Sequence, residues 1–375
     1  MINVCHVTTV HSRYDVRIFE KECTSLAELG YNTTLIVNDQ GEDEVKNGVN
    51  IVSLHQPPRN RIDRATRIVR IALQKALEVD ADIYHLHDPE LLRIAKKLCS
   101  IGKKVVFDSH EFTAMQIMTK PYLPAGVRGL LSKVYLSYEN RILNTISGLV
   151  VPCSYNGRDY FDKVHKPKAV IGNYPKLAIL EQYADRSKDA ADGKVCYVGG
   201  ISASRGLFHM VRGAYIAGRK LVLIGNISDE LRTELEQMPE FSCVELLGRL
   251  PHDIALREMA KCSAGLSLLQ DEGQYAKLDN LPTKLYEYMS MGIPAVVSNF
   301  SYYCETLKCY KYGIAVDPSD DNAIAEAINK VIDDEKLRTE MMSEGRRAIR
   351  ETMNWEADAE KLDGFYKNLC HVDQY

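Results

Sequence analysis

Residues 279–298 read DNLPTKLYEYMSMGIPAVVS and contain a complete helix followed by a strand. Pro282 suits the first turn of a helix, because its missing N–H removes no intrahelical hydrogen bond there. Leu285, Tyr288 and Met289 recur at helical spacing and predict a buried stripe. The last four residues, AVVS, form a β-branched apolar run that predicts a strand. This order is typical of parallel sheets whose strands alternate with helices.

The same alternation runs through all 375 residues and predicts two successive α/β halves. In the first half we expect strands at Asn3–Val7, Thr33–Val37, Ile51–Leu54, Ile83–His87, Lys104–Asp108 and Gly148–Pro152. In the second half we expect them at Ala169–Gly172, Lys194–Val198, Lys220–Ile224, Val244–Leu247, Ala264–Leu269, Ala295–Ser298 and Gly313–Val316. Prolines and charged residues at 163–175 indicate the boundary. We therefore predict a domain of residues 1–165, joined by a C-terminal helix at 355–375, and a second domain of residues 166–354.

The composition is that of a globular protein, with 45% hydrophobic and 26% charged residues. The net charge of −4 gives no overall attraction to nucleic acid. The ten cysteines are dispersed without metal-site spacing, which indicates reduced thiols. The N-terminus lacks the features of a signal peptide, and no apolar run approaches the ~20 residues of a membrane span. We expect a cytoplasmic protein that meets a membrane, if at all, from its inner surface.

Lys284 and Glu287 share one face of the helix in the opening stretch, at a spacing of three residues. One interpretation is a solvated ion pair, which is common on helices. The other places Lys284 and the free amides of the helix start on an anionic phosphate, with Glu287 accepting from ribose hydroxyls.

A second chemical signal is Tyr197-Val198-Gly199-Gly200-Ile201-Ser202-Ala203-Ser204-Arg205-Gly206. A strand ends in two glycines and a helix then begins, which lets backbone amides approach a phosphate. It could equally be a plain turn with an exposed arginine, because glycine is the default residue of tight turns. No strand is followed by GxGxxG, so a nicotinamide dehydrogenase is disfavoured.

These stretches resemble the donor-binding motifs of the family 4 glycosyltransferases, which have the GT-B fold of two Rossmann-like domains facing across a cleft. The family has two glutamates separated by seven residues, which fall here on Asp279 and Glu287. It also has a G-R-x-x-x-x-K-G loop, where Gly200 replaces the first cation and Arg205 matches the second. The resemblance implies that Arg205 and Lys284 hold the donor diphosphate as catalytic residues.

The resemblance extends to turns at other strand ends of the second half. Asn173-Tyr174-Pro175, Gly225-Asn226 and Gly248-Arg249-Leu250-Pro251 appear in the family's order, although each by itself is an ordinary turn. The donor-binding residues expected on this basis are Gly199, Gly200, Ser204, Asn173, Gly225, Arg249, Leu250, Asp279, Leu281 and Glu287.

Three polar loops follow strands of the first half, beginning with His11, His87 and Asp108. A single histidine at a strand end usually has a structural hydrogen bond, but three such loops at neighbouring strand ends indicate a site. In the family, the histidine that matches His110 lies near the transferred sugar, which implies a catalytic role. The acceptor-side candidates are His11, Asp15, Arg17, His87, Asp88, Glu90 and Glu111.

The resemblance implies a hexosyltransferase that moves a sugar from a nucleotide-diphosphate donor, with UDP-sugar favoured, and retains the anomeric configuration. We expect a glycan or lipid-linked acceptor and a role in surface polysaccharide biosynthesis. The sequence shows no DxD loop and no cluster of carboxylates and histidines with metal spacing, so we expect no cofactor and no metal. Two alternatives remain at this point: a GT-B-like sugar-nucleotide epimerase, and a non-catalytic protein that binds sugar nucleotides.

Residues 58–78 combine basic side chains with an apolar repeat at helical spacing. One interpretation is a surface helix whose apolar stripe packs on the sheet while its arginines are solvated. The alternative is a basic amphipathic helix that contacts anionic lipid, which predicts peripheral attachment to a membrane.

Overall fold

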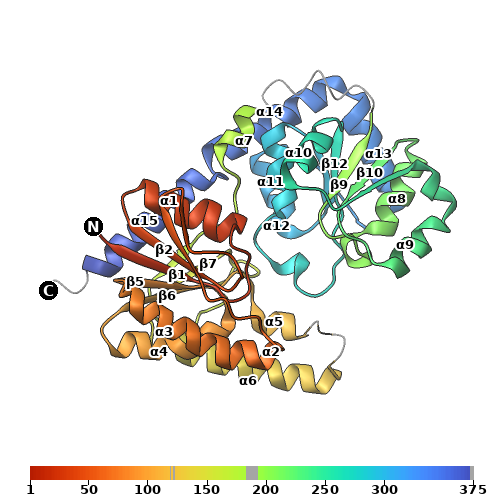
Figure 1. Ribbon diagram of the computed structural model, residues 1–375. Coiled ribbons are helices and arrows are strands. Elements are labelled where there is room, and N and C mark those ends of the chain that lie inside the picture. Colours follow the sequence, from red (N-terminus) through yellow and green to blue (C-terminus); the bar gives the residue numbers. More distant parts are fainter. Residues whose placement is uncertain (119, 121–122, 183–192, 372–375) are drawn as a thin grey trace. The chain divides into compact units, whose positions relative to one another are not determined.

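The computed structural model describes residues 1–118, 120, 123–182 and 193–371. The chain divides into two compact units (Figure 1). The first unit combines Met1–Asn173 with Trp355–Tyr375, and the second is Tyr174–Asn354. Each unit is an α/β structure built on one sheet.

The first unit contains an eight-stranded sheet in the order β3-β4-β2-β1-β5-β6-β7-β8. All neighbouring strands are parallel except β3 and β4, which are antiparallel. Its strands are β1 (Asn3–Val7), β2 (Asn32–Val37), β3 (Glu44–Lys46), β4 (Val49–Ser53), β5 (Ile83–Leu86), β6 (Lys104–Asp108), β7 (Gly148–Val151) and β8 (Lys168–Val170). The edge strand β3 was not predicted, since only three residues form it and two of them are charged.

The strand predicted at Ala169–Gly172 does not open the second half. As β8 it pairs with β7 of the first sheet, with Leu149 opposite Lys168. The boundary therefore lies after Asn173 and not at 165/166. The prolines near this position mark an edge strand and its exit, which the sequence pattern alone does not distinguish from a linker.

Helical segments cover the first sheet. They are η1 (Val16–Cys23), α1 (Thr24–Glu28), α2 (Arg61–Asp63), η2 (Arg64–Ile68), α3 (Val69–Val79), η3 (Pro89–Leu91), α4 (Leu92–Ser100), α5 (Thr113–Met118), α6 (Ala125–Leu143) and α15 (Trp355–His371). The last of these returns to the first unit as predicted. Trp355 is buried, and its Nε1 donates to Ser25 Oγ at 2.8 Å. Together with Phe365 and Tyr366 it shares one apolar cluster with Val4 of the central strand.

The second unit contains a six-stranded parallel sheet in the order β11-β10-β9-β12-β13-β14. Its strands are β9 (Val195–Val198), β10 (Leu221–Ile224), β11 (Val244–Gly248), β12 (Ala264–Ser267), β13 (Ala295–Ser298) and β14 (Gly313–Val316). Its helical segments are α7 (Leu177–Gln182), η5 (Ala203–Arg205), α8 (Leu207–Ile216), α9 (Asp229–Glu236), η6 (Pro239–Cys243), α10 (His252–Ala260), η7 (Tyr275–Lys277), α11 (Thr283–Met291), α12 (Ser301–Cys309), α13 (Asp321–Asp333) and α14 (Glu335–Glu351).

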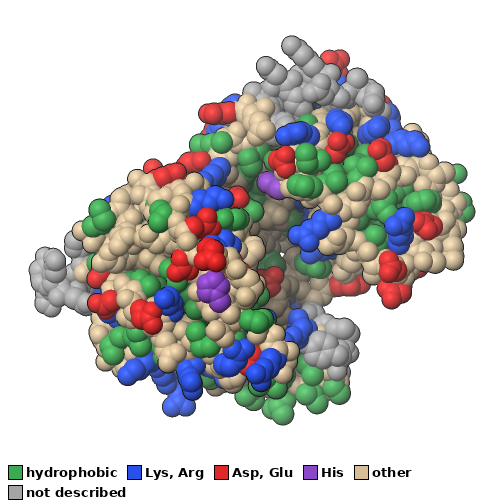
Figure 2. Space-filling view, in the orientation of Figure 1, with side chains coloured by type: hydrophobic (Ala, Val, Ile, Leu, Met, Phe, Trp, Pro, Cys, Tyr) green, Lys and Arg blue, Asp and Glu red, His purple; other side chains and the backbone are tan. Residues whose placement is uncertain are grey.

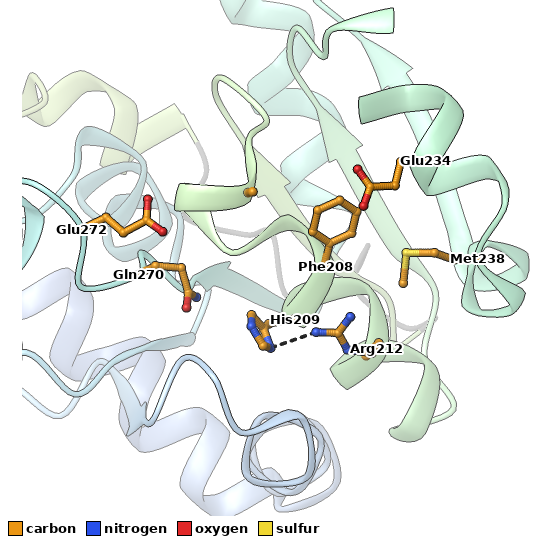
Figure 3. Close-up of a pocket in the computed structure, with 8 residues that line it drawn as sticks. Phe208, His209, Arg212, Glu234, Met238, Gln270 and Glu272 are labelled. Atoms are coloured by element: carbon orange, nitrogen blue, oxygen red, sulfur yellow. Dashed lines mark hydrogen bonds between the residues drawn. The ribbon is translucent and has the colours of Figure 1, made fainter. Parts of the chain in front are cut away.

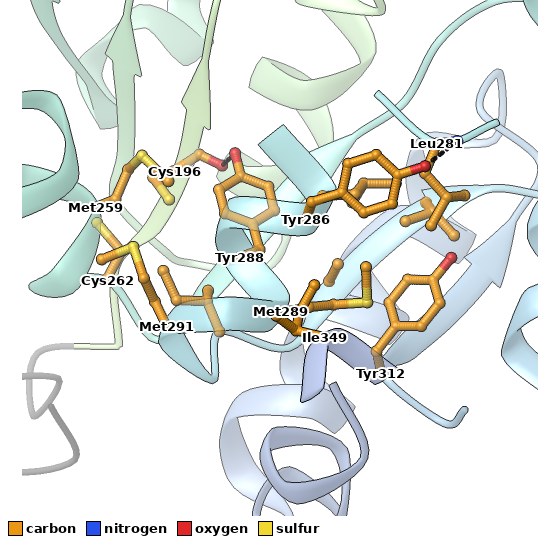
Figure 4. Packing of buried hydrophobic residues seen from close by; sticks show 14 of the residues in the cluster. Cys196, Met259, Cys262, Leu281, Tyr286, Tyr288, Met289, Met291, Tyr312 and Ile349 are labelled. Atoms are coloured by element: carbon orange, nitrogen blue, oxygen red, sulfur yellow. Dashed lines mark hydrogen bonds between the residues drawn. The ribbon is translucent and has the colours of Figure 1, made fainter. Parts of the chain in front are cut away.

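Helix α11 is fixed in this unit by the apolar stripe that the sequence predicted (Figure 4). Leu285, Tyr288 and Met289 are at most 1% exposed. Tyr288 Oη also donates to the carbonyl of Cys196 on β9 at 3.3 Å. Burying a large apolar side chain contributes about 1.5–3 kcal/mol. This packing holds the start of α11 in a defined place beside the end of β9.

Candidate functional site

The loop between β9 and α8 turns sharply after two glycines. Gly206, which ends this loop, has φ +82°, and an added Cβ would lie 2.1 Å from the carbonyl oxygen of Leu268. Only glycine fits there, so residue type and close packing fix the path of the loop. The amides of Arg205 and Gly206 bond to Ser202 and Ala203 within the turn. These two amides are therefore engaged within the turn, and the charged group of the loop is the side chain of Arg205. That the other amides of the loop approach a phosphate stays a prediction.

Arg205 and Lys284 come from separate elements and meet at Gly199. A Cβ built on Gly199 would lie 3.6 Å from Arg205 Nη1 and 3.7 Å from Lys284 Nζ. Lys284 lies in the first turn of α11, whose start has no side-chain cap. The two cations and the uncapped helix start thus converge on the glycine at the carboxyl end of β9.

This pair of cations is not neutralised by a protein carboxylate. Among the described residues, neither side chain forms an ion pair with Asp or Glu. Lys284 is only 6% exposed, and its Nζ lies 4.8 Å from the centre of the Tyr197 ring. Burial, together with repulsion from Arg205, lowers the pKa of Lys284 to about 7. An anion bound at Gly199 would offset this repulsion.

Glu287 is not paired with Lys284, so the solvated ion pair is not what the structure contains. Its Oε1 lies 2.8 Å from Nε2 of His252 on α10. His252 is more than half exposed and Glu287 is 18% exposed at the side chain. The sequence reasoning missed this histidine, which is distant in the chain and directly follows the predicted turn Gly248–Pro251.

The other donor-side candidates fall into three groups: residues that are at least partly accessible, leucines that pack with the apolar cluster, and residues with structural partners. Gly199, Gly200, Ser204 and Arg249 are at least partly accessible, and Asp279 is half-buried and engaged in contacts of its own. Leu281 and Leu250 pack in or against the apolar cluster around α11, and the Leu281 amide donates to Tyr286 Oη. These two leucines are explained by packing.

Gly225 and Asn173 have structural partners. A Cβ on Gly225 would lie 1.7 Å from the carbonyl oxygen of Gly199, so this glycine allows the close approach of β9 and β10 at their ends. Asn173 belongs to the first unit, where its Oδ1 accepts from Lys21 Nζ at 2.7 Å. Asn173 therefore falls outside the unit that holds the other donor-side candidates.

A pocket of about 410 Å³ in the second unit is lined in part by Ala203, which belongs to η5 together with Arg205 (Figure 3). Its lining includes Phe208, Arg212, Glu234 and Glu272. Arg212 is already paired with Asp321, and the two glutamates would repel a diphosphate. Neither Arg205 nor Lys284 lines this pocket, so it does not contain the pair of cations.

In the first unit, the three predicted polar loops do meet at one edge of the sheet. Strands β1, β5 and β6 are neighbours, and His11, His87 and His110 follow or end them. The His11 and His110 rings lie 4.9 Å apart between centroids, and His87 Nδ1 lies 3.0 Å from His110 Nε2. The prediction that these loops are neighbours is confirmed.

Asp108 organises the inner part of this edge. Arg17 donates to its two oxygens at 3.1 Å each, and His110 Nε2 lies 3.1 Å from Asp108 Oδ2. Burial would raise the pKa of Asp108, but Arg17 and His110 hold it well below its usual value. Asp108 Oδ2 therefore faces Nε2 of His110 and fixes the orientation of that ring.

Arg17 and His87 were predicted to contact the acceptor, but the structure places both inside the first unit. Arg17 is 6% exposed and also donates to the carbonyls of Ile171 and Gly172. His87 is 2% exposed and is held between His6 and His110. Neither side chain reaches the surface, so both act by positioning Asp108 and His110.

The remaining acceptor-side candidates differ in exposure. Asp88 is buried and accepts from Thr8 and Thr9, so it holds the loop after β1. Asp15 caps η1 by accepting from two backbone amides and also faces His11. Glu90 pairs with Arg64. His11, His110 and Glu111 have accessible surface, although His11 also faces Asp15 and Asp88, and His110 faces Asp108.

Two family models match the chain, one to each unit. "Glycosyltransferase Family 4" matches residues 16–173, and "Glycosyl transferases group 1" matches residues 182–348. The chain belongs to the family 4 glycosyltransferases. As such it is an enzyme of the hexosyltransferase class. No curated protein matches this glycosyltransferase in sequence.

Solved structures confirm the GT-B fold of this glycosyltransferase. Sucrose-phosphate synthase from Thermosynechococcus elongatus superposes with a TM-score of 0.78 at 15% identity, covering 100% of both chains. HepE from Anabaena, solved in complex with UDP and glucose, gives 0.71 at 13% identity and covers 98% of this chain and 100% of that one. A glycosyltransferase from Rickettsia africae gives 0.71 at 13% identity and covers 99% of each chain.

The fold of this glycosyltransferase also assembles a histidine and carboxylate cluster that the sequence did not predict. His6 on β1, Glu22 on η1 and His85 and His87 on β5 bring four candidate ligand atoms within 4.8 Å of one another. The premise that no such cluster has metal spacing is therefore wrong, because residues distant in the chain meet on adjacent strands. The signal that could have found it is His85 and His87 on one face of a strand, two residues apart.

Proposed function

We propose that this glycosyltransferase transfers a hexose from a UDP-sugar to a glycan or lipid-linked acceptor, with retention of configuration. The observation that carries the proposal is the convergence of Arg205 and Lys284 on Gly199, where neither forms an ion pair with a carboxylate of the described residues. Two cations in that arrangement suit a group with two adjacent negative charges, as a nucleotide diphosphate has. UDP as the nucleotide is supported by HepE, whose structure contains UDP.

The difficult part of the reaction is the separation of charge as the diphosphate leaves the sugar. Arg205 and Lys284 would stabilise the negative charge that develops on the leaving oxygen, which is often the largest single contribution to catalysis. In this scheme a donor phosphate oxygen takes the proton of the acceptor hydroxyl on the face from which the diphosphate departs. The sugar then bonds to the acceptor oxygen on that same face, and configuration is retained.

The other groups have roles that follow from their exposure. Glu287 would accept from the ribose hydroxyls after exchanging its contact with His252. His110 would contact the transferred sugar through Nδ1, because its Nε2 faces Asp108. His11 and Glu111 would contact the acceptor.

Attachment to a membrane is supported better by α6 than by residues 58–78. In the latter segment Ile68, Val69, Ala72 and Ala76 are buried, so its apolar stripe packs inside the unit. Two of its arginines, Arg64 and Arg67, are in ion pairs. The described part of the chain contains no helix long and apolar enough to cross a membrane.

Helix α6 presents an apolar stripe to solvent instead, and hydrophobic side chains gather over it among basic ones (Figure 2). The exposed residues of this stripe are Val127, Leu130, Leu131, Val134 and Tyr138. They recur at helical spacing, beside the exposed Lys133. We propose that this face meets the inner surface of the membrane, where a lipid-linked acceptor in surface polysaccharide biosynthesis would lie.

A binding panel tests the donor. The thermal transition is measured with UDP-, GDP-, ADP- and CMP-sugars, each at a concentration far above its expected dissociation constant. A ligand at 100 times that constant adds about 2.7 kcal/mol of stability. We expect UDP-sugars to give the largest shift, and a larger shift with another base would replace UDP as the donor.

Transfer itself should proceed in EDTA, because the proposed charge stabilisation uses side chains alone. The assay follows UDP release in the presence of an acceptor extract. The proposal fails if EDTA stops turnover and Mg²⁺ or Mn²⁺ restores it.

A further inference from the structure

We propose that the first unit binds one structural zinc ion, held by His6, Glu22, His85 and His87. These four side chains come from β1, η1 and β5 and have no solvent exposure at all. The reaction proposed above has no use for them as ligands, and the zinc proposal does not depend on that reaction.

Glu22 Oε2 lies among the three histidine nitrogens, two of which, His6 Nδ1 and His87 Nε2, are hydrogen-bonded to each other at 2.9 Å. Glu22 Oε2 lies 3.7 Å from His6 Nδ1, 3.9 Å from His85 Nδ1 and 3.9 Å from His87 Nε2. These separations are too long for hydrogen bonds. In a tetrahedral zinc site with bonds of 2.0–2.2 Å, neighbouring ligand atoms lie about 3.3–3.6 Å apart. The four atoms already lie within 4.8 Å of one another, and binding of one ion would separate His6 Nδ1 from His87 Nε2 and draw the wider pairs together.

Some buried polar atoms of the cluster have no hydrogen-bond partner. Glu22 makes no hydrogen bond through Oε2, although Oε1 faces Arg17 at 3.1 Å. Nε2 of His6 and Nε2 of His85 are likewise buried without a hydrogen bond. A buried polar atom left in this way costs about 1–3 kcal/mol. An ion at the centre of the cluster would bind Glu22 Oε2 and offset part of that cost.

The surroundings match those of a zinc ligand set. His87 faces the cluster with Nε2, while its Nδ1 lies 3.5 Å from Asp108 Oδ2. A ligating histidine whose other nitrogen faces a carboxylate is the usual arrangement around zinc. Tyr366 Oη, from α15, is hydrogen-bonded to His85 Nδ1 at 2.5 Å, and zinc at the centre of the cluster would replace this contact.

Three histidines and one glutamate favour zinc over Mg²⁺ or Ca²⁺, which prefer oxygen ligands. The complete burial of the four side chains leaves no open position for a substrate. The ion would join β1 and β5 to η1, and it would stabilise the first unit and not take part in transfer.

The test measures zinc and stability without any donor. The full chain is prepared without chelators in zinc-supplemented medium, and zinc per chain is determined by mass spectrometry. The comparison is between wild type, Glu22→Gln and the matched control Glu139→Gln, which alters another buried carboxylate of the same unit. We expect about one zinc per chain in wild type and in Glu139→Gln. In Glu22→Gln we expect a loss of at least tenfold in zinc affinity.

Two results would overturn the proposal. In the first, wild type contains no stoichiometric zinc and its thermal transition does not rise when zinc is added. In the second, Glu22→Gln contains as much zinc as wild type. If Glu22→Gln does not fold, Co²⁺ is loaded into wild type. The visible absorption of a four-coordinate cobalt site then supports the proposal, and its absence contradicts it. A failed donor panel would leave all these readouts unchanged.

Discussion

Glu287 Oε1 and His252 Nε2 lie 2.8 Å apart and join the helix that carries Lys284 to the helix that follows β11. The contact occupies the carboxylate that the proposal assigns to ribose. Donor binding must therefore replace one partner of Glu287 with another.

Glu287→Gln should weaken UDP-sugar and UDP alike, because both contain the ribose. We expect a loss of about tenfold in each affinity, or 1.4 kcal/mol. His252→Ala should not weaken either ligand, since it only frees the carboxylate. Calorimetric titration of the three proteins decides this. An unchanged UDP affinity in Glu287→Gln would refute the ribose role.

Arg17→Met should destabilise the first unit strongly. It removes the buried cation between Asp108 and Glu22 and leaves Asp108 as an uncompensated buried charge. Breaking such a pair costs about 3–5 kcal/mol. Lys75→Ala, which removes a surface ion pair with Glu78 in the same unit, should cost less than about 1 kcal/mol. Urea unfolding measures the free energy of unfolding of both variants. Equal losses would show that the Arg17 network stabilises the unit no more than a surface ion pair does.

The lowered pKa of Lys284 predicts a pH-dependent donor affinity. In the free enzyme Lys284 loses its proton near pH 7, while a bound diphosphate favours the charged form. UDP binding should therefore take up protons at pH 7.5 and weaken as the pH rises from 6 to 8.5. Lys284→Arg should remove this proton uptake, because arginine stays charged. Titrations in buffers of different ionisation enthalpy measure it, and identical uptake in the variant would exclude Lys284 as the source.

The lowered pKa of Lys284 also makes the stability of the free enzyme depend on pH. Below pH 7 both folded and unfolded chains keep the Lys284 proton, and the folded state carries the full cost of the buried charge. As the pH rises above 7 the folded state releases the proton first, so this cost declines. Lys284→Met should accordingly stabilise the free enzyme at pH 6 by on the order of 3 kcal/mol, and less at pH 8.5. Thermal unfolding at the two pH values checks the direction.

Membrane contact through α6 predicts sedimentation with anionic vesicles at low salt. Leu130→Ser combined with Val134→Ser should reduce the bound fraction severalfold, because both side chains are more than half exposed on the stripe. Ile216→Ser, an exposed apolar position in the second unit, is the matched control and should behave as wild type. Equal sedimentation of the double variant and the control would remove α6 from the proposal.

The sequence predicted the fold well because helix and strand patterns are local. The burial of Tyr288, the return of Trp355 to the first unit and the meeting of three loops at β1, β5 and β6 all follow from periodicity and parallel topology. The errors are non-local. Whether β8 belongs to the first or second sheet depends on a pairing with β7 that its three residues do not encode.

In the candidate site, too, some features were predicted from local patterns and others depend on contacts between distant segments. Arg205 and Lys284 were predicted from their positions at separate helix starts, and the structure brings them together at Gly199. The inward direction of Arg17 and His87 was not predictable, because it depends on Asp108 and on carbonyls of the distant β8 exit. The contact between Glu287 and His252 likewise requires the packing of α10 beside α11.

The central claim is that Arg205 and Lys284 together hold the donor diphosphate, and UDP titration of four proteins tests it most directly. We compare wild type, Arg205→Ala, Lys284→Ala and Lys277→Ala, whose exposed lysine lies before α11 and has no assigned role. The account predicts that the first two variants remain folded and lose at least tenfold in UDP affinity, about 1.4 kcal/mol each, while Lys277→Ala matches wild type. Wild-type affinity in Arg205→Ala or Lys284→Ala would contradict the account.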